Sequence, residues 1–129
     1  MFVSKGKELI EVCNKKNITI WEYTLGEEIE KSGLSREKVI EKMRQNLNVM
    51  ISSSSYAQEN NVKSVSGLIG GDALKLKKYA QSGNTLTGEF MVSAMARAIS
   101  SSEVNAAMGK IVACPTAGSC GILPAAILS

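Results

Sequence analysis

Apolar side chains recur every three to four residues along most of this chain, which is the spacing of one face of a helix. The strongest repeat follows Ser35, a residue type that caps helices, and predicts a helix that continues to about Asn60. A second repeat starts at Leu86 or Thr87. Its predicted inner face comprises Phe90, Met91, Ala94, Met95, Ala98 and Ile99. We expect the serines that follow to end this helix, with Ser102 and Glu103 capping a new one.

Shorter apolar patterns fill the first quarter of the chain. A helix is predicted from Ser4 to about Lys16, because Ser4 is a suitable cap and Asn17 suits its end. The segment 17–25 alternates apolar and polar residues, so it is either a short strand or a linker into a helix. The helical piece after it is expected to end near Gly33.

The remaining apolar patterns surround two glycine-containing segments. Gly67, Gly70 and Gly71 predict a loop, and Asp72 is expected to cap a helix that runs to about Gln81. The last segment, "ILPAAILS", predicts a helix with Pro124 in its first turn. The fold class is therefore mainly α, bundle-like. Because so short and wholly apolar a helix needs packing partners, we expect residues 1–129 to be the N-terminal part of one longer domain that ends here inside a helix.

Composition and charge argue against several classes of protein. A chain of 129 residues holds one domain at most, and a net charge of +3 with lysines spread among glutamates does not favour a nucleic acid or membrane partner. No apolar run approaches the roughly 18 residues of a membrane span. Three cysteines and no signal peptide favour a reducing compartment, so a cytoplasmic location is expected.

The chain has no histidine, which excludes Ser-His-Asp triads, Cys-His pairs and histidine-based zinc sites within it. The densest chemical candidate is "CPTAGSCG", where glycines allow close backbone approach and hydroxyls precede a helix N-terminus. The segment is either a cradle for a carboxylate or a tight loop between packed segments. Cys120 could be a nucleophile, a ligand or a core thiol, although its six-residue distance from Cys114 is unlike common metal pairs.

A second glycine segment is the turn formed by Gly70, Gly71 and Asp72, which opens a predicted helix. Such a turn can bind an anion on backbone N–H groups, but the Asp72 carboxylate would repel a phosphate. It is neither a dinucleotide-binding fingerprint nor a P-loop, and ordinary use as a turn and cap is the simpler interpretation. No segment has the pattern of a pyridoxal phosphate site.

Two long segments, "SGLIGGDALKLKKYAQSGNTLTG" and "EVNAAMGKIVACPTAGSCGILPA", resemble the alpha chain of bacterial iron–sulfur L-serine dehydratases. "KELIEVCNKKNITIWEYTLGEEIE" also fits the start of such chains. The resemblance implies a mainly helical fold and conversion of L-serine to pyruvate and ammonia without pyridoxal phosphate. It also implies a 4Fe–4S cluster whose open iron acts on the substrate hydroxyl, and a separate beta chain as partner.

The resemblance places the cluster cysteines in segments beyond Ser129, so no metal ligand is assigned to this chain and the base that removes the α-proton is not identified. It implies that one loop lines the cluster and substrate pocket. That loop comprises Pro115, Thr116, Ala117, Gly118, Ser119, Cys120 and Gly121. Gly70, Gly71 and Asp72 are secondary candidates. The chain alone is expected to be inactive without the rest of the alpha chain. A small helical binding module without chemistry is the alternative.

Overall fold

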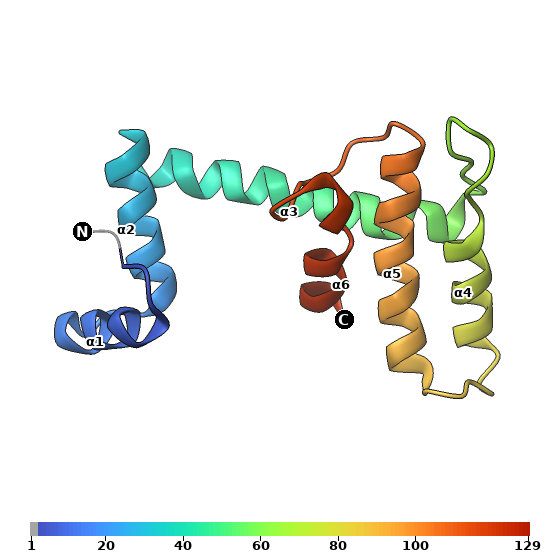
Figure 1. Ribbon diagram of the computed structural model, residues 1–129, viewed down its shortest axis with the longest axis horizontal. Helices are drawn as coiled ribbons and strands as arrows, with labels where there is room; N and C mark the ends of the chain where they lie inside the picture. The colour runs from blue at the N-terminus through green and yellow to red at the C-terminus, as the bar shows by residue number, and fades with distance from the viewer. Residues whose placement is uncertain (1–2) are drawn as a thin grey trace. The chain divides into compact units, whose positions relative to one another are not determined.

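The computed structural model describes residues 3–129, and within that range it is helical with no strand (Figure 1). Its elements are α1 (Gly6–Lys16), α2 (Ile20–Ser32), α3 (Arg36–Glu59), α4 (Asp72–Gln81), α5 (Glu89–Ala106), the 3-10 turn η1 (Ala117–Ser119) and α6 (Ile122–Leu128). The chain divides into two compact units, one ending at Arg44 and one starting at Gln45. The mainly α prediction is confirmed.

In the first unit, α2 begins with a complete capping box. The Thr19 hydroxyl accepts the backbone N–H of Glu22 at 3.4 Å, and the Thr19 N–H donates to Glu22 Oε2 at 2.8 Å. The backbone hydrogen bond from Thr19 is the main cause that lowers the pKa of Glu22. The strand alternative for residues 17–25 is therefore wrong. The linker alternative holds only for residues 17–19, because α2 begins at Ile20, inside the segment.

The C-terminal ends of α1 and α2 agree with their predictions, whereas the start of α1 does not. Asn17 and Gly33 end the two helices in the left-handed conformation, which these residue types tolerate best. The start of α1 differs, because Lys5 occupies the N-cap position and no side chain caps the helix. The prediction that Ser4 caps α1 is wrong.

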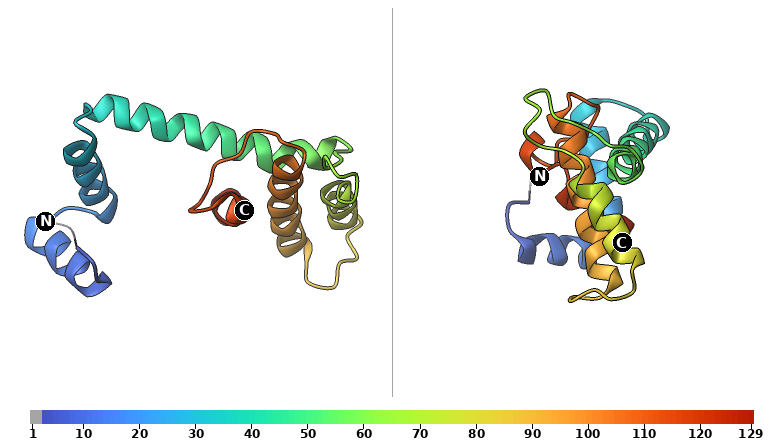
Figure 2. Two further views of the ribbon diagram at one scale, coloured as in Figure 1. Left: turned by 45° about the horizontal axis from the view of Figure 1, so that its top comes forward. Right: turned by 90° about the vertical axis from the view of Figure 1, so that its right-hand side faces the viewer.

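In the second unit, small side chains form the centre of the packing. Ala57 of α3, Ala73 of α4 and Val104 of α5 form the buried cluster, with Val62 and Ile111 against it. Helix α5 packs along α4 and also contacts α6, and the views in Figures 1 and 2 agree on this order. Most buried apolar residues of this unit are small, whereas many of its larger apolar residues are exposed.

Helix α5 contradicts two predictions. It continues through the serine run to Ala106, and its buried face comprises Val92, Ala96, Ser100, Ser101, Glu103 and Val104. Phe90, Met91, Met95 and Ile99, predicted to face inward, are exposed at 67%, 49%, 47% and 36%. The face with the large apolar residues is therefore not the packed face.

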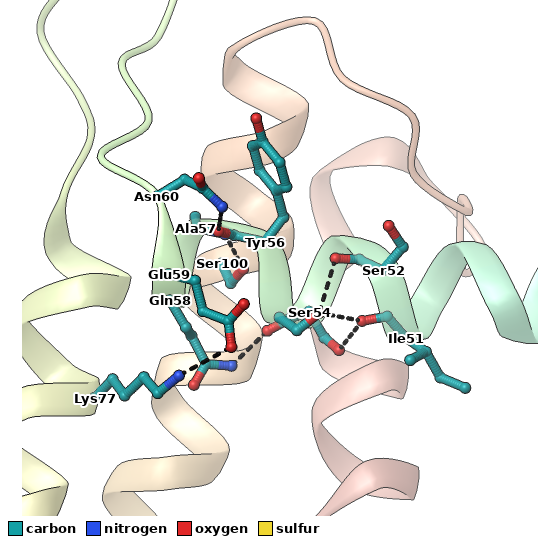
Figure 3. A network of polar contacts seen from close by, with 11 residues as sticks. Ile51, Ser52, Ser54, Tyr56, Ala57, Gln58, Glu59, Asn60, Lys77 and Ser100 are labelled. Atoms are coloured by element: carbon teal, nitrogen blue, oxygen red, sulfur yellow. Dashed lines mark hydrogen bonds and ion pairs between the residues drawn. The ribbon is translucent and has the colours of Figure 1, made fainter.

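The serines do not break α5 because α3 satisfies them. The Ser100 hydroxyl donates to the Ser53 carbonyl at 2.7 Å. It also accepts the Ala57 N–H at 3.0 Å (Figure 3). Ser53 and Ala57 are four residues apart, so this hydroxyl bridges a carbonyl and an N–H of one turn of α3. Ser53 Oγ also lies 3.3 Å from Ser101 Oγ. A hydroxyl whose partners are fixed in this way is compatible with a helix interior.

The remaining helices lie where they were predicted, except that α4 begins at Asp72, the residue predicted to cap it. The helix predicted after Ser35 is α3, and the Ser35 hydroxyl accepts the Lys38 N–H at 3.4 Å. Helix α4 ends at Gln81 as expected, and α6 carries Pro124 in its first turn. None of the helices described between residues 3 and 129 is both long and apolar enough to cross a membrane.

Candidate functional site

The loop from Pro115 to Gly121 is shaped by one serine. Ser119 Oγ donates to the Cys114 carbonyl at 2.7 Å and accepts the Thr116 N–H at 3.3 Å. The Thr116 hydroxyl lies 3.1 Å from the same oxygen, and the Cys114–Pro115 peptide bond is cis. These contacts close the loop on itself around η1. The sequence pattern identified the hydroxyls, but it did not show that they bind each other.

One face of α5 anchors this loop. The Cys120 thiol lies 3.7 Å from the Ser101 carbonyl, and the Asn105 side-chain amide donates to the Ala117 carbonyl at 3.4 Å. At Gly121 an added Cβ would overlap the Ala98 carbonyl oxygen and lie 3.0 Å from its carbon. Ala98, Ser101 and Asn105 are spaced by three and four residues, so they share one face of the helix.

The loop has an exposed part and a buried part. Pro115, Thr116, Ala117 and Gly118 are exposed, Ser119 is half-buried, and Cys120 and Gly121 are buried. Gly118 has open space around it, since the nearest atom to an added Cβ is Thr116 Oγ1 at 3.9 Å. The tip from Pro115 to Gly118 can therefore contact a ligand or another chain, whereas Cys120 and Gly121 fix the loop to α5.

Cys120 is a core thiol in this structure. Its side chain is 2% exposed, and burial raises the pKa of its thiol, which keeps it protonated at neutral pH. Cys114 is half-buried, and Cys13 is buried in the first unit. Across residues 3–129 there is no group of three His, Cys, Asp or Glu side chains placed to hold a metal ion. The described cysteines do not make a cluster site.

The second candidate, the turn at Gly70 and Gly71, depends on glycine for its shape. Gly70 has a φ of 147° and Gly71 a φ of 82°, both in the region that side chains rarely adopt. A Cβ on Gly70 would also overlap the Val62 carbonyl oxygen. Gly71 occupies the N-cap position of α4, so Asp72 is the first helical residue and not the predicted cap.

A buried carboxylate from α5 supplies the cap that α4 lacks locally. Glu103 Oε1 accepts the backbone N–H of Asp72 at 2.6 Å and approaches that of Ala73 at 3.4 Å. Glu103 is 2% exposed, and its second oxygen, Oε2, is buried with no hydrogen-bond donor in the described part of the chain. The prediction that Glu103 caps a new helix together with Ser102 is wrong, because α5 is unbroken there.

The two candidate segments are therefore held by the same two turns of α5. Glu103 binds the turn before α4, while Ala98, Ser101 and Asn105 contact the loop before α6. The only sequence signal for Glu103 is an isolated acidic residue among small and apolar neighbours. A carboxylate stabilises a helix N-terminus whichever element supplies it, so sequence position alone does not identify the helix it caps.

Two hollows in the second unit lie beside other residues. One, of about 510 Å³, lies between α3, α4 and α5, with Leu128 at its edge. It contains Arg97, a half-buried guanidinium with no ion pair within residues 3–129, and the Lys77–Glu59 pair at 3.2 Å (Figure 3). The other, of about 460 Å³, is lined by Tyr56, Asn60 and Lys110 among others. Both are lined by a mixture of polar and apolar residues and are open to solvent.

These features define a helical chain that presents a closed serine and glycine loop on a helix of small residues. Residues 15–129 match the serine dehydratase alpha chain family. The L-serine dehydratase alpha chain of Peptoniphilus asaccharolyticus is 40% identical over 127 residues, which cover 98% of this chain and 44% of the relative. The probable L-serine dehydratase alpha chain of Bacillus subtilis (strain 168) is 41% identical over 123 residues, covering 95% and 41%.

The chain therefore belongs to the serine dehydratase alpha chain family, as the resemblance of its two long segments indicated. It spans less than half the length of these two relatives. No solved structure matches it significantly.

Proposed function

We propose that this chain forms part of an L-serine ammonia-lyase, which converts L-serine to pyruvate and ammonia, and that the loop from Pro115 to Gly121 forms one wall of its substrate pocket. The observation that carries the proposal is the anchoring of this loop on α5, which fixes its buried end and leaves its tip exposed. A loop on a rigid helix is the usual way in which a protein positions a binding surface.

The exposed tip offers the kind of groups that bind a small amino acid. The Thr116 hydroxyl oxygen can accept a hydrogen bond from a substrate ammonium group, and Gly118 leaves the space that close approach requires. Ser119 keeps the loop closed through its bond to the Cys114 carbonyl, so its role is to position Thr116. The buried, protonated Cys120 takes no part in acid–base chemistry on this proposal.

The family resemblance implies an iron–sulfur cluster, and the described cysteines do not fit one. Cys120 is directed at the Ser101 carbonyl, and Cys13 belongs to the other unit. We therefore assign the cluster ligands to polypeptide that this chain does not contain and derive no chemical step through the cluster. A beta chain and the rest of the alpha chain are the partners on this proposal, and the location is cytoplasmic.

Anaerobic reconstitution tests the proposal. Residues 1–129 treated with iron and sulfide should not form pyruvate from L-serine, whereas a complete enzyme containing this chain should. In that complete enzyme Thr116→Val should raise KM for L-serine with a smaller effect on kcat, because it removes a binding hydroxyl. Activity of residues 1–129 alone, or an unchanged KM for the variant, would contradict the proposed role.

A further inference from the structure

Helices α5 and α6 bury small residues and expose most of their large apolar ones. The buried apolar positions of α5 and α6 are two valines, two alanines and one proline, none larger than valine. The exposed positions include Met95 at 47%, Ile122 at 69% and Ile127 at 51%. Soluble proteins rarely leave large apolar side chains grouped on adjacent helices unless another polypeptide covers them.

These exposed side chains are arranged in two strips. On α5 they are Met91, Met95 and Ile99, four residues apart and hence aligned on one face. At 100° per residue, this strip lies between the buried face of α5 and the face that contacts the loop before α6. On α6, Pro124 and Ala125 are buried, and Ile122, Leu123 and Ile127 are exposed. We name these six residues the α5–α6 apolar surface.

The charge distribution argues against an electrostatic partner for this surface. Helix α6 contains no charged residue, and Arg97 is the only charged residue of α5 between Phe90 and Ser102. An uncharged strip of methionine, isoleucine and leucine is typical of a surface that packs against other helices. A nucleic acid or a charged peptide would find no complementary group on it.

The family relatives indicate which polypeptide covers the surface. This chain matches them over 98% and 95% of its own length, yet more than half of each relative has no counterpart in it. We propose that the α5–α6 apolar surface is the docking surface for that remaining part of a serine dehydratase alpha chain, which presents an apolar face of its own. The inference rests on the proposed function, because it takes the remainder of an alpha chain as the partner.

Co-purification tests this docking without requiring activity. Tagged residues 1–129 are co-expressed with the part of the Peptoniphilus asaccharolyticus alpha chain that lies outside the alignment, and the two pieces should purify together. The double substitution Met95→Lys with Ile127→Lys should lower the amount of retained partner by about tenfold or more, since it places two charges in an apolar contact. Circular dichroism should show unchanged helix content.

The control is Met43→Lys, which changes a more accessible methionine (65% exposed, against 47% for Met95) in the first unit and should leave retention unchanged. Retention by the double variant, or no complex with the unmodified chain, would overturn the docking proposal. So would a dimer of residues 1–129 by light scattering that the double variant dissociates, because a second copy would then occupy the surface. A complex that forms normally but lacks serine-dependent pyruvate formation would contradict the proposed function alone.

Discussion

Glu103 Oε1 accepts a hydrogen bond from the backbone N–H of Asp72 at 2.6 Å, across 31 positions of sequence. Through this bond a carboxylate near the end of α5 caps the start of α4. The first N–H groups of a helix have no partner within it, and a buried carboxylate there satisfies two of them while opposing the positive end of the helix dipole. The bond therefore couples the Gly70–Gly71 turn to the helix that anchors the candidate loop.

Replacing Glu103 should destabilise the second unit strongly. Glu103→Ala removes a charged cap from two buried N–H groups and should cost about 2 kcal/mol or more of unfolding free energy. Glu103→Gln keeps one acceptor oxygen and should cost less. Urea unfolding followed by circular dichroism measures both. Ser102→Ala, an exposed neighbour, is the control; equal losses for Ser102→Ala and Glu103→Ala would refute the capping role.

Substitution by alanine should affect folding stability at only one of the two glycines of the candidate loop. Gly121→Ala places a Cβ against the Ala98 carbonyl and should destabilise the second unit by about 2 kcal/mol, because backbone atoms cannot move aside. Gly118→Ala meets only Thr116 Oγ1 at 3.9 Å and should be close to neutral for folding. Thermal unfolding of both variants checks this, and a neutral Gly121→Ala would contradict the close approach.

The Ser100 hydroxyl should contribute to the packing of α3 on α5. Ser100→Ala removes its bonds to the Ser53 carbonyl and the Ala57 N–H and should cost about 1 kcal/mol. Hydrogen exchange at the Ala57 amide should become faster in the variant. Ser55→Ala, whose exposed hydroxyl bonds only within α3, serves as the control. The bridge would be disproved by an unchanged exchange rate at Ala57.

The thiols should react in an order set by burial. Iodoacetamide labelling followed by peptide mass spectrometry should modify half-buried Cys114 well before buried Cys120. Burial raises the pKa of Cys120, so the folded state keeps its proton at pH values where the unfolded thiol has lost it. The contribution of Cys120 to stability is therefore complete below about pH 8.5 and declines as the pH rises above that value.

The test of this pH dependence is a comparison with Cys120→Ser, which does not titrate in that range. The stability of the unmodified chain should fall more steeply than that of the variant as the pH rises above about 8.5. Equal labelling rates of Cys114 and Cys120 at neutral pH would show that Cys120 is accessible. An accessible Cys120 could act as a ligand or a nucleophile, and its assignment as a core thiol would be wrong.

Local patterns predicted the helices well and the buried faces poorly. The ends of α1 and α2 could be predicted because Asn17 and Gly33 carry local conformational preferences. The buried face of α5 could not be, because hydrophobic periodicity assumes that the largest apolar residues face inward. In α5 the packed face is made of small residues, and Ser100 contributes through a hydroxyl whose partners lie 43 and 47 positions away.

The sequence by itself determined the helical class, the candidate loop and the family, since spacing, turn residues and two long motifs are local properties of the chain. Only the tertiary structure decided what holds the loop and the Gly70 turn. The anchors are Ala98, Ser101, Glu103 and Asn105, all on α5. A hydrogen bond or a close approach between distant segments depends on how helices pack, and no local pattern encodes that contact.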